Sequence, residues 1–251
     1  MICALFGGQG EEHGRILSAP DAWTQTLRGF ASEAVNDDIG ELIRRGRFLS
    51  QAVLQPSIVA ALLAAWGPTQ ADVAAGHSLG ELAALAAVGA WTPKQAIFAA
   101  SARGIAMATV AFPGGQVAVN ALPDLLAWPD LALAGHVAPG VWTVSGPTEA
   151  LRLYAAATGA RPVAVSGPWH HPRMAAAAPL WRGALHTLVE PQGRWEPAHN
   201  LRLAPCEALL TQLGAPADWV GAATRAVLGA DTTVAIGRRV WAPAGATRRY
   251  L

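Results

Sequence analysis

The segment GHSLGE at residues 76–81 has the composition of a nucleophilic serine site. A Gly-x-Ser-x-Gly pattern between a short apolar strand and a helix is typical of a sharp turn from which the serine projects alone. Gly76 and Gly80 suit this turn because it leaves almost no room for side chains on either side of Ser78. The N-terminus of the following helix carries free N–H groups and partial positive charge, which would stabilise an oxyanion. We therefore predict that Ser78 is a nucleophile; the alternative is a serine helix cap with incidental glycines.

A serine hydroxyl needs a base within hydrogen-bonding distance. The segment GPWHHPRM at residues 167–174 supplies two candidates, His170 and His171. Histidine titrates near neutral pH, so it can take the serine proton and return it to a leaving thiolate. Neighbours on an extended loop point in opposite directions, so only one of the two can face Ser78. His77 is closer in sequence, but the residue before such a serine points away from it, and we expect His77 to pack.

The elements expected around these residues indicate a parallel α/β body. Residues 2–6 are typical of a buried strand, and residues 55–66 carry apolar side chains at helical spacing. The threonine–proline pair at 92–93 predicts the start of a helix that runs to about residue 110. A final strand is expected at 232–236.

Short strands replace this pattern between residues 112 and 166. The expected order of strand, helix, strand, strand, helix, strand is typical of a ferredoxin-like module. We expect its strands at 117–120, 131–134, 141–145 and 161–165, and its helices at 123–128 and 148–158. Beyond the module, a helix is expected at 174–188 and a strand at 197–203. We therefore predict an α/β body formed by residues 1–111 and 167–251, with an inserted ferredoxin-like subdomain at 112–166.

Composition narrows the functional classes. The 251 residues are 52% hydrophobic and 14% charged, and the net charge of +1 argues against nucleic acid as a partner. Neither a membrane-spanning apolar run nor a basic signal-peptide start is found, so we expect a soluble cytoplasmic protein without a membrane partner. Cys3 and Cys206 lack metal-ligand spacing and are expected to be buried thiols, and the histidines form no known metal motif, so no metal site is predicted.

Several short motifs occur in the order of a known family. They are GQG at 8–10, Gln55-Pro56, GHSLGE at 76–81, Arg103-Gly104 with Met107, and Trp169-His170 with Pro172 and Met174. Over nearly the whole chain, the set resembles malonyl-CoA:acyl carrier protein transacylases and the related acyltransferase domains of polyketide synthases. The resemblance implies an α/β-hydrolase-like parallel-sheet body with an inserted ferredoxin-like subdomain, in agreement with the expected elements.

The resemblance also implies a catalytic apparatus. Ser78 would carry the acyl group as an ester, and His170, rather than His171, would be the general base and acid. Gln9 and the backbone N–H of Leu79 would form the oxyanion hole, although Gln9 considered alone could equally cap a turn. In such enzymes a backbone carbonyl, rather than an acidic side chain, orients the histidine, and spacing places that carbonyl near Leu228.

Substrate contacts follow from the same resemblance. Arg103 would bind an acyl carboxylate, since its planar guanidinium can donate two parallel hydrogen bonds; the alternative is an ordinary surface arginine. Such a pocket would disfavour acetyl, by about 10⁴-fold at most, because acetyl leaves the buried cation unpaired. Gln55 and Trp169 are predicted to contact substrate, and the bulky Trp169 ring would suit malonyl better than methylmalonyl. Val137 lies where Asn or Gln is common, which leaves the exact acyl group open.

We therefore predict an acyltransferase that moves a malonyl group, or a related dicarboxylic acyl group, from CoA to the phosphopantetheine thiol of an acyl carrier protein. The CoA thioester is a substrate, and no cofactor is expected. A serine hydrolase, such as an editing thioesterase acting on acyl-CoA or acyl carrier protein, would use the same residues but admit water. A non-catalytic scaffold subunit is a second rival. Fatty acid and polyketide pathways both stay open.

Overall fold

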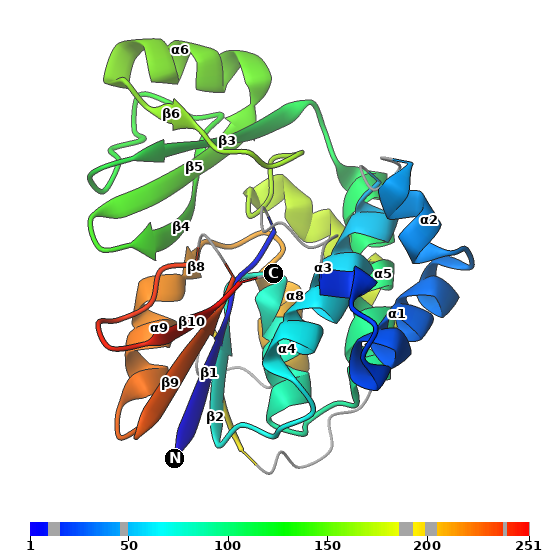
Figure 1. Ribbon diagram of the computed structural model, residues 1–251. Helices are drawn as coiled ribbons and strands as arrows, with labels where there is room; N and C mark the ends of the chain where they lie inside the picture. Colours follow the sequence, from blue (N-terminus) through cyan, green and yellow to red (C-terminus); the bar gives the residue numbers. More distant parts are fainter. Residues whose placement is uncertain (10–15, 46–49, 186–192, 199–204, 238–239, 251) are drawn as a thin grey trace.

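The computed structural model describes residues 1–9, 16–45, 50–185, 193–198, 205–237 and 240–250. A five-stranded parallel sheet forms the centre of the larger body (Figure 1). In spatial order its strands are β10 (Thr247–Arg249), β9 (Thr232–Ile236), β1 (Ile2–Phe6), β2 (Val73–Gly76) and β7 (Arg194–Glu196). The predicted strands at 2–6 and 232–236 are confirmed. The edge strand β10 was not predicted because its sequence, TRR, is short, polar and exposed.

The central strand separates two apolar cores, because successive side chains of a strand point to opposite faces. Ala4 and Phe6 join the core beneath the larger helices, whereas Cys3 and Leu5 join the core formed with α9 (Trp219–Val227). The helices of the first core are α1 (Ala22–Val35), α2 (Ile39–Arg44), α3 (Gln51–Trp66), α4 (Gly80–Ala87) and α5 (Pro93–Val110), with the short 3-10 turn η1 (Ile16–Ser18) before α1. The sheet therefore has helices on both faces, and the predicted α/β class is confirmed.

Two of these helices position the site. The predicted start of α5 is confirmed: the Thr92 side chain accepts a hydrogen bond from the Gln95 N–H, and the Gln95 Oε1 accepts one from the Thr92 backbone N–H. Helix α3 begins at Gln51, four residues before the predicted start, so Pro56 lies inside it. Proline cannot donate to the carbonyl one turn earlier. That carbonyl belongs to Ala52; the Ser101 hydroxyl lies 3.4 Å from it, but the shorter hydrogen bond of this hydroxyl is to the Ala34 carbonyl, at 3.1 Å.

The second sheet has the strand order β6-β3-β5-β4-β8. The first four strands pair antiparallel in the order that a βαββαβ module produces, and β8 joins parallel to β4. Their bounds are β3 Gly114–Val119, β4 Ala132–Ala138, β5 Val141–Pro147, β6 Arg161–Pro162 and β8 Ala217–Asp218, and α6 (Thr148–Thr158) covers one face. Because β8 comes from the C-terminal part of the chain, the domain boundaries at 112 and 166 stay a prediction.

The helix predicted at 123–128 is wrong. Residues 120–131 form turns, in which the Asp124 carboxylate accepts a hydrogen bond from the Leu126 N–H at 3.0 Å. Prolines at 123 and 129 bracket the segment and leave too few residues for a stable helix. The Trp128 ring still packs edge-on against Tyr154 of α6, so the segment covers that helix without being helical.

After the second sheet, the structure departs from the expected long helix at 174–188. A 3-10 segment, η2 (Pro172–Ala177), leads into the short helix α7 (Ala178–Arg182), and residues 186–188 lie outside the described residues. Residues 197 and 198 are not in a strand, and 199–203 of that predicted strand lie outside the described residues. Helix α8 (Pro205–Thr211) follows. Cys3 is buried, but Cys206 on α8 is only partly buried, so the expectation of two buried thiols is wrong for Cys206.

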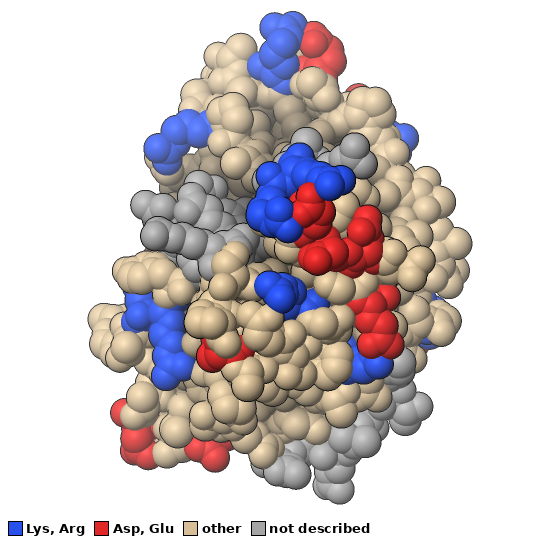
Figure 2. All heavy atoms as spheres, turned by 45° about the vertical axis from the view of Figure 1, so that its right-hand side comes forward, with Lys and Arg blue, Asp and Glu red and all other residues tan. Residues whose placement is uncertain are grey.

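Charged side chains of both signs are interspersed on the surface. Figure 2 shows basic and acidic groups beside one another on the face it presents. Glu41 pairs with Arg44 and Arg45 on α2, and Lys94 pairs with Glu33 at 2.7 Å. In the described part of the chain, no helix combines the length and the apolar composition that a membrane span requires.

Candidate active site

Ser78 lies at the tight turn between β2 and α4. Its backbone has φ 54°, the left-handed region that a non-glycine residue adopts only when its surroundings enforce it. The flanking glycines show the constraint: a methyl group at Gly76 would lie 2.1 Å from the Glu81 nitrogen, and one at Gly80 would lie 2.3 Å from the carbonyl oxygen of Gly7. The same close approach brings the loop after β1 to the serine.

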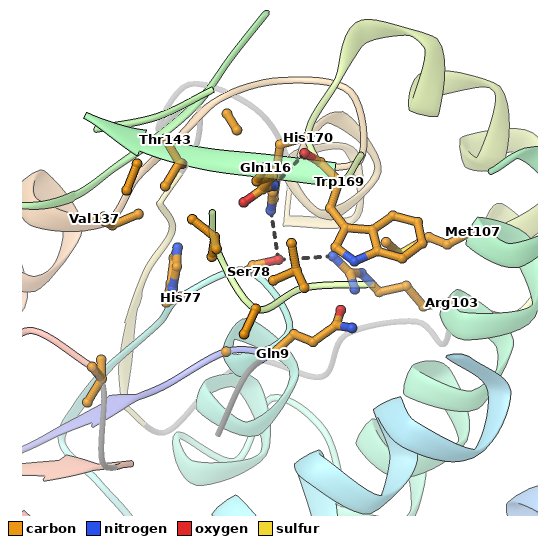
Figure 3. A pocket seen from close by; sticks show the side chains of 17 residues that line it. Gln9, His77, Ser78, Arg103, Met107, Gln116, Val137, Thr143, Trp169 and His170 are labelled. Atoms are coloured by element: carbon orange, nitrogen blue, oxygen red, sulfur yellow. Dashed lines mark hydrogen bonds between the residues drawn. The ribbon is translucent and has the colours of Figure 1, made fainter. Parts of the chain in front are cut away.

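His170 faces this serine. Its Nε2 lies 2.9 Å from the Ser78 Oγ, and its backbone is also left-handed, with φ 63° (Figure 3). His171 turns the other way: its Nε2 lies 3.3 Å from the Asp130 carbonyl oxygen, its ring meets Phe112 edge-on, and burial lowers its pKa. His77 packs against Trp219, although it also borders the cavity beside the serine. Of the three histidines, only His170 is hydrogen-bonded to Ser78 in the described structure.

The carbonyl that orients His170 belongs to Gln212, not to Leu228. His170 Nδ1 lies 2.7 Å from the Gln212 carbonyl oxygen and 3.2 Å from that of Ala215, whereas Leu228 ends α9 and is 66% exposed. The prediction of a carbonyl near Leu228, made by counting back from the final strand, is wrong because the carbonyls that contact His170 come from the turn that follows α8. A methyl group at Gly214 would lie 2.7 Å from the Ala175 side chain, so this turn packs closely against η2, the segment that follows the two histidines.

The tautomer of His170 follows from these partners. A backbone carbonyl only accepts hydrogen bonds, so Nδ1 carries the proton and donates. Nε2 therefore has its lone pair free to accept the serine O–H. The described contacts thus place an acceptor nitrogen against the Ser78 hydroxyl, and the partners of Nδ1 are backbone carbonyls.

Arg103 reaches the same hydroxyl from α5. It is 1% exposed, and its Nη2 donates to the Ser78 Oγ at 3.2 Å (Figure 3). Its other acceptors are the Gln55 Oε1, 3.0 Å from Nη1, and the Gln212 Oε1, 3.2 Å from Nη2. Among the described residues it forms no salt bridge, and burial lowers its pKa to about 10 against an opposing attraction to the buried Glu81. A buried cation with neutral hydrogen-bond partners favours an anionic ligand.

A family model described as the acyl transferase domain matches residues 46–208, a segment that includes Ser78, Arg103 and His170. The chain belongs to the acyl transferase family.

Similar proteins are known in sequence and in structure. This acyl transferase is 31% identical over 237 residues to highly reducing polyketide synthase 19 of Pyricularia oryzae, an alignment that covers 88% of the chain and 9% of that protein. A malonyl-transacylase solved in complex with its type II polyketide acyl-carrier protein superposes with a TM-score of 0.82 at 24% identity, covering 94% of this chain and 88% of the other. An acyl carrier protein S-malonyltransferase of Vibrio cholerae gives 0.79 at 25% identity, with 94% and 89% covered. The chain spans less than a tenth of the length of the curated relatives it matches.

A cavity of about 280 Å³ opens at the serine of the acyl transferase. Gln9, Ser78, Arg103, Trp169 and His170 border it from the body. The second sheet faces them with Gln116, Ala118, Ala134, Val137 and Thr143, and the segment after β6 adds Val163 and Val165, so this wall is mostly apolar (Figure 3). These five predicted site residues, which come from distant parts of the chain, therefore meet at one cavity, whereas the predicted Gln55 and Leu79 do not line it.

The oxyanion hole predicted at Gln9 and Leu79 rests on backbone groups. The Gln9 side chain donates to the Ser166 hydroxyl at 3.3 Å, and we expect its backbone N–H to be the group that serves an oxyanion. Leu79 is the first residue after the serine and caps α4, and its N–H has no hydrogen-bond acceptor among the described residues. Both residues are placed beside Ser78, and their role in the reaction stays a prediction.

The two predicted substrate contacts differ in how directly they face the cavity. Gln55 is fully buried and contacts Arg103 rather than the cavity, with its own amide donating to Gln51 at 2.9 Å. Trp169 borders the cavity, and in Figure 3 its ring lies beside Arg103 and Met107. Gln55 is therefore placed to hold the arginine, and Trp169 to limit the space beside it.

Gln51, Ser166 and Gln212 are polar residues of the site that were not predicted. Gln51 donates to the Ser166 hydroxyl at 2.7 Å, so Ser166 links the Gln9 and Gln51 side chains, and Gln51 in turn accepts from Gln55. A signal for Gln51 existed, because it lies one helical turn before Gln55. Gln212 had no local signal, since its two contacts are made with residues far away in the sequence.

Proposed function

We propose that this acyl transferase moves a malonyl group from CoA to the phosphopantetheine thiol of an acyl carrier protein through an ester on Ser78. The observation that carries the proposal is the Arg103 guanidinium, buried without a salt bridge among the described residues and 3.2 Å from the Ser78 Oγ. In a malonyl ester the carboxylate carbon is three bonds from Oγ, within reach of that guanidinium. A guanidinium in this place supports a short dicarboxylic acyl group over a neutral one.

In the first half-reaction, Ser78 attacks the thioester carbonyl while His170 Nε2 accepts its proton. The backbone N–H groups of Gln9 and Leu79 would donate to the tetrahedral oxyanion. Its collapse expels the CoA thiolate, which takes the proton from His170. The reverse sequence, with the carrier thiol as nucleophile, completes transfer. A thioester is already activated toward acyl transfer, so the reaction needs no cofactor.

The relatives support this substrate pair. The structural neighbours are a malonyl-transacylase in complex with an acyl-carrier protein and an acyl carrier protein S-malonyltransferase. The family match supports transfer over hydrolysis. The apolar wall that the second sheet contributes to the cavity would also limit the hydrogen bonds available to an attacking water.

The test is intact-mass spectrometry after exposure to malonyl-CoA, methylmalonyl-CoA and acetyl-CoA, followed by addition of a phosphopantetheine-bearing carrier protein. We expect a malonyl adduct that is absent in Ser78→Ala and that leaves when the carrier is added. Rapid release of free malonate without carrier would instead identify a hydrolase. No adduct with any acyl-CoA would identify a scaffold and overturn the proposal.

A further inference from the structure

Gln212 contacts both the predicted base, His170, and the buried cation, Arg103. Its backbone carbonyl accepts from His170 Nδ1 at 2.7 Å, and its side-chain Oε1 accepts from Arg103 Nη2 at 3.2 Å. Ser78 Oγ contacts the same two residues, since it lies 2.9 Å from His170 Nε2 and 3.2 Å from Arg103 Nη2. The nucleophile, the base and the cation are therefore joined in a ring through one further residue.

The Gln212 side chain is fully buried, and its position is tightly constrained. It follows the last turn of α8, where its N–H donates to the Ala208 carbonyl at 3.2 Å. The close contact between Gly214 and Ala175 holds the rest of this turn against η2. Its Nε2 has no hydrogen-bond partner among the described residues, which is costly for a buried amide. An aliphatic side chain would avoid this cost, so the amide is better explained by its contact with Arg103.

Because the Gln212 side-chain amide is uncharged, it does not neutralise the Arg103 guanidinium. The hydrogen-bonding side chains around Arg103 are Gln55, Gln212 and Ser78, all of them uncharged, and the indole of Trp181 lies 5.7 Å from its guanidinium carbon. Glu81 is the acidic group that acts on it electrostatically, without a salt bridge to it in the described structure. A carboxylate at the position of either amide would pair with the guanidinium and compete with an acyl carboxylate.

We propose that Gln212 is a specificity-determining positioning residue, whose amide orients Arg103 toward Ser78 while leaving its charge available to the acyl carboxylate. The Gln212 carbonyl accepts from His170 Nδ1 whatever side chain stands at this position, so a substitution can change the amide and keep this contact. The inference rests on the proposed malonyl transfer.

The experiment compares malonyl and acetyl loading of Ser78 in two variants that keep the Gln212 carbonyl. Gln212→Glu is nearly isosteric and adds an internal carboxylate beside Arg103; we expect the ratio of malonyl to acetyl loading rates to fall about 100-fold. Gln212→Met keeps the volume but removes the acceptor; we expect that ratio to fall about 10-fold. Thr211→Glu is the matched control, because it adds the same charge at the neighbouring exposed position and should leave both rates unchanged.

The outcomes separate the inference from the proposed function. If the wild-type protein loads malonyl selectively but both variants lose malonyl and acetyl loading by the same factor, Gln212 has only a structural role and the inference is overturned. If Gln212→Glu does not fold, as judged by circular dichroism, the ratio in Gln212→Met decides. If the wild-type protein itself does not prefer malonyl, the proposed function fails.

Discussion

Replacing Arg103 by Met tests the basis of substrate selection most directly. Methionine fills much of the same space and removes the guanidinium, whose Nη2 lies 3.2 Å from the Ser78 Oγ. A malonyl carboxylate would then enter a buried site without its counter-charge, whereas acetyl brings no charge to be compensated. We expect malonyl loading to fall steeply and acetyl loading to change by less than about 10-fold.

The size of the effect follows from the geometry. Opposite unit charges at about 4 Å attract by about 4 kcal/mol at an effective dielectric constant of 20. Hydrogen bonds to a charged group contribute about 1.5–3 kcal/mol each, so both approaches give a loss of about 3–4 kcal/mol. At about 1.4 kcal/mol per factor of ten, kcat/KM for malonyl-CoA should fall by about 10²- to 10³-fold.

The assay is stopped-flow or quenched intact-mass measurement of Ser78 acylation with malonyl-CoA and acetyl-CoA. Thermal unfolding of the same variant provides the folding control. Loss of the arginine leaves the Oε1 atoms of Gln55 and Gln212 without their donor, but it also removes a costly buried charge, so the net change in stability should be small. A fall in both acylation rates by the same factor would refute the assignment of Arg103 to carboxylate binding.

Three further predictions test the site and the fold. His170→Ala should slow Ser78 acylation by about 10²- to 10⁴-fold, whereas His171→Ala, which removes contacts to the Asp130 carbonyl, the Phe112 ring and the Arg173 N–H but none to Ser78, should keep the acylation rate within about 10-fold; the reverse ranking in the mass assay would move the base to His171. Gly80→Ala should destabilise the fold by about 1–3 kcal/mol, because its methyl group would meet the Gly7 carbonyl oxygen at 2.3 Å. Gly29→Ala, which places its methyl group in open space on an exposed face of α1, should stabilise the fold by about 0.5–1 kcal/mol. Equal unfolding free energies for the two variants would contradict the turn geometry. Burial raises the pKa of Cys3 from 9.0 to about 12, so the folded state holds this thiol proton more tightly than the unfolded state does. The free energy of unfolding should therefore decline as pH rises from about 9 toward 12. Denaturant titrations over this pH range should show a smaller decline for Cys3→Ala.

Local patterns in the sequence predicted those parts of the fold whose cause is itself local. The apolar run at 2–6 reads correctly as a strand because it is buried on both faces of a parallel sheet. The start of α5 is readable because Thr92 and Gln95 satisfy the first backbone N–H groups of their own helix. One error has a local cause as well, since the prolines at 123 and 129 preclude the predicted helix, whereas Pro56 lies inside α3 although a proline is expected near the start of a helix.

The sequence by itself determined the chemical groups of the site. Gly76 and Gly80 specify the turn that exposes Ser78, and the motif around His170 predicts this residue as the base. Only the tertiary structure decided how those groups act together. The Gln212 carbonyl, and not one near Leu228, sets the histidine tautomer, and amides from α3 and from the turn after α8 hold Arg103 against the serine. The physical reason is that a tight turn is dictated by sterics between neighbouring residues, whereas a hydrogen-bonded ring across four segments exists only after the cores have packed.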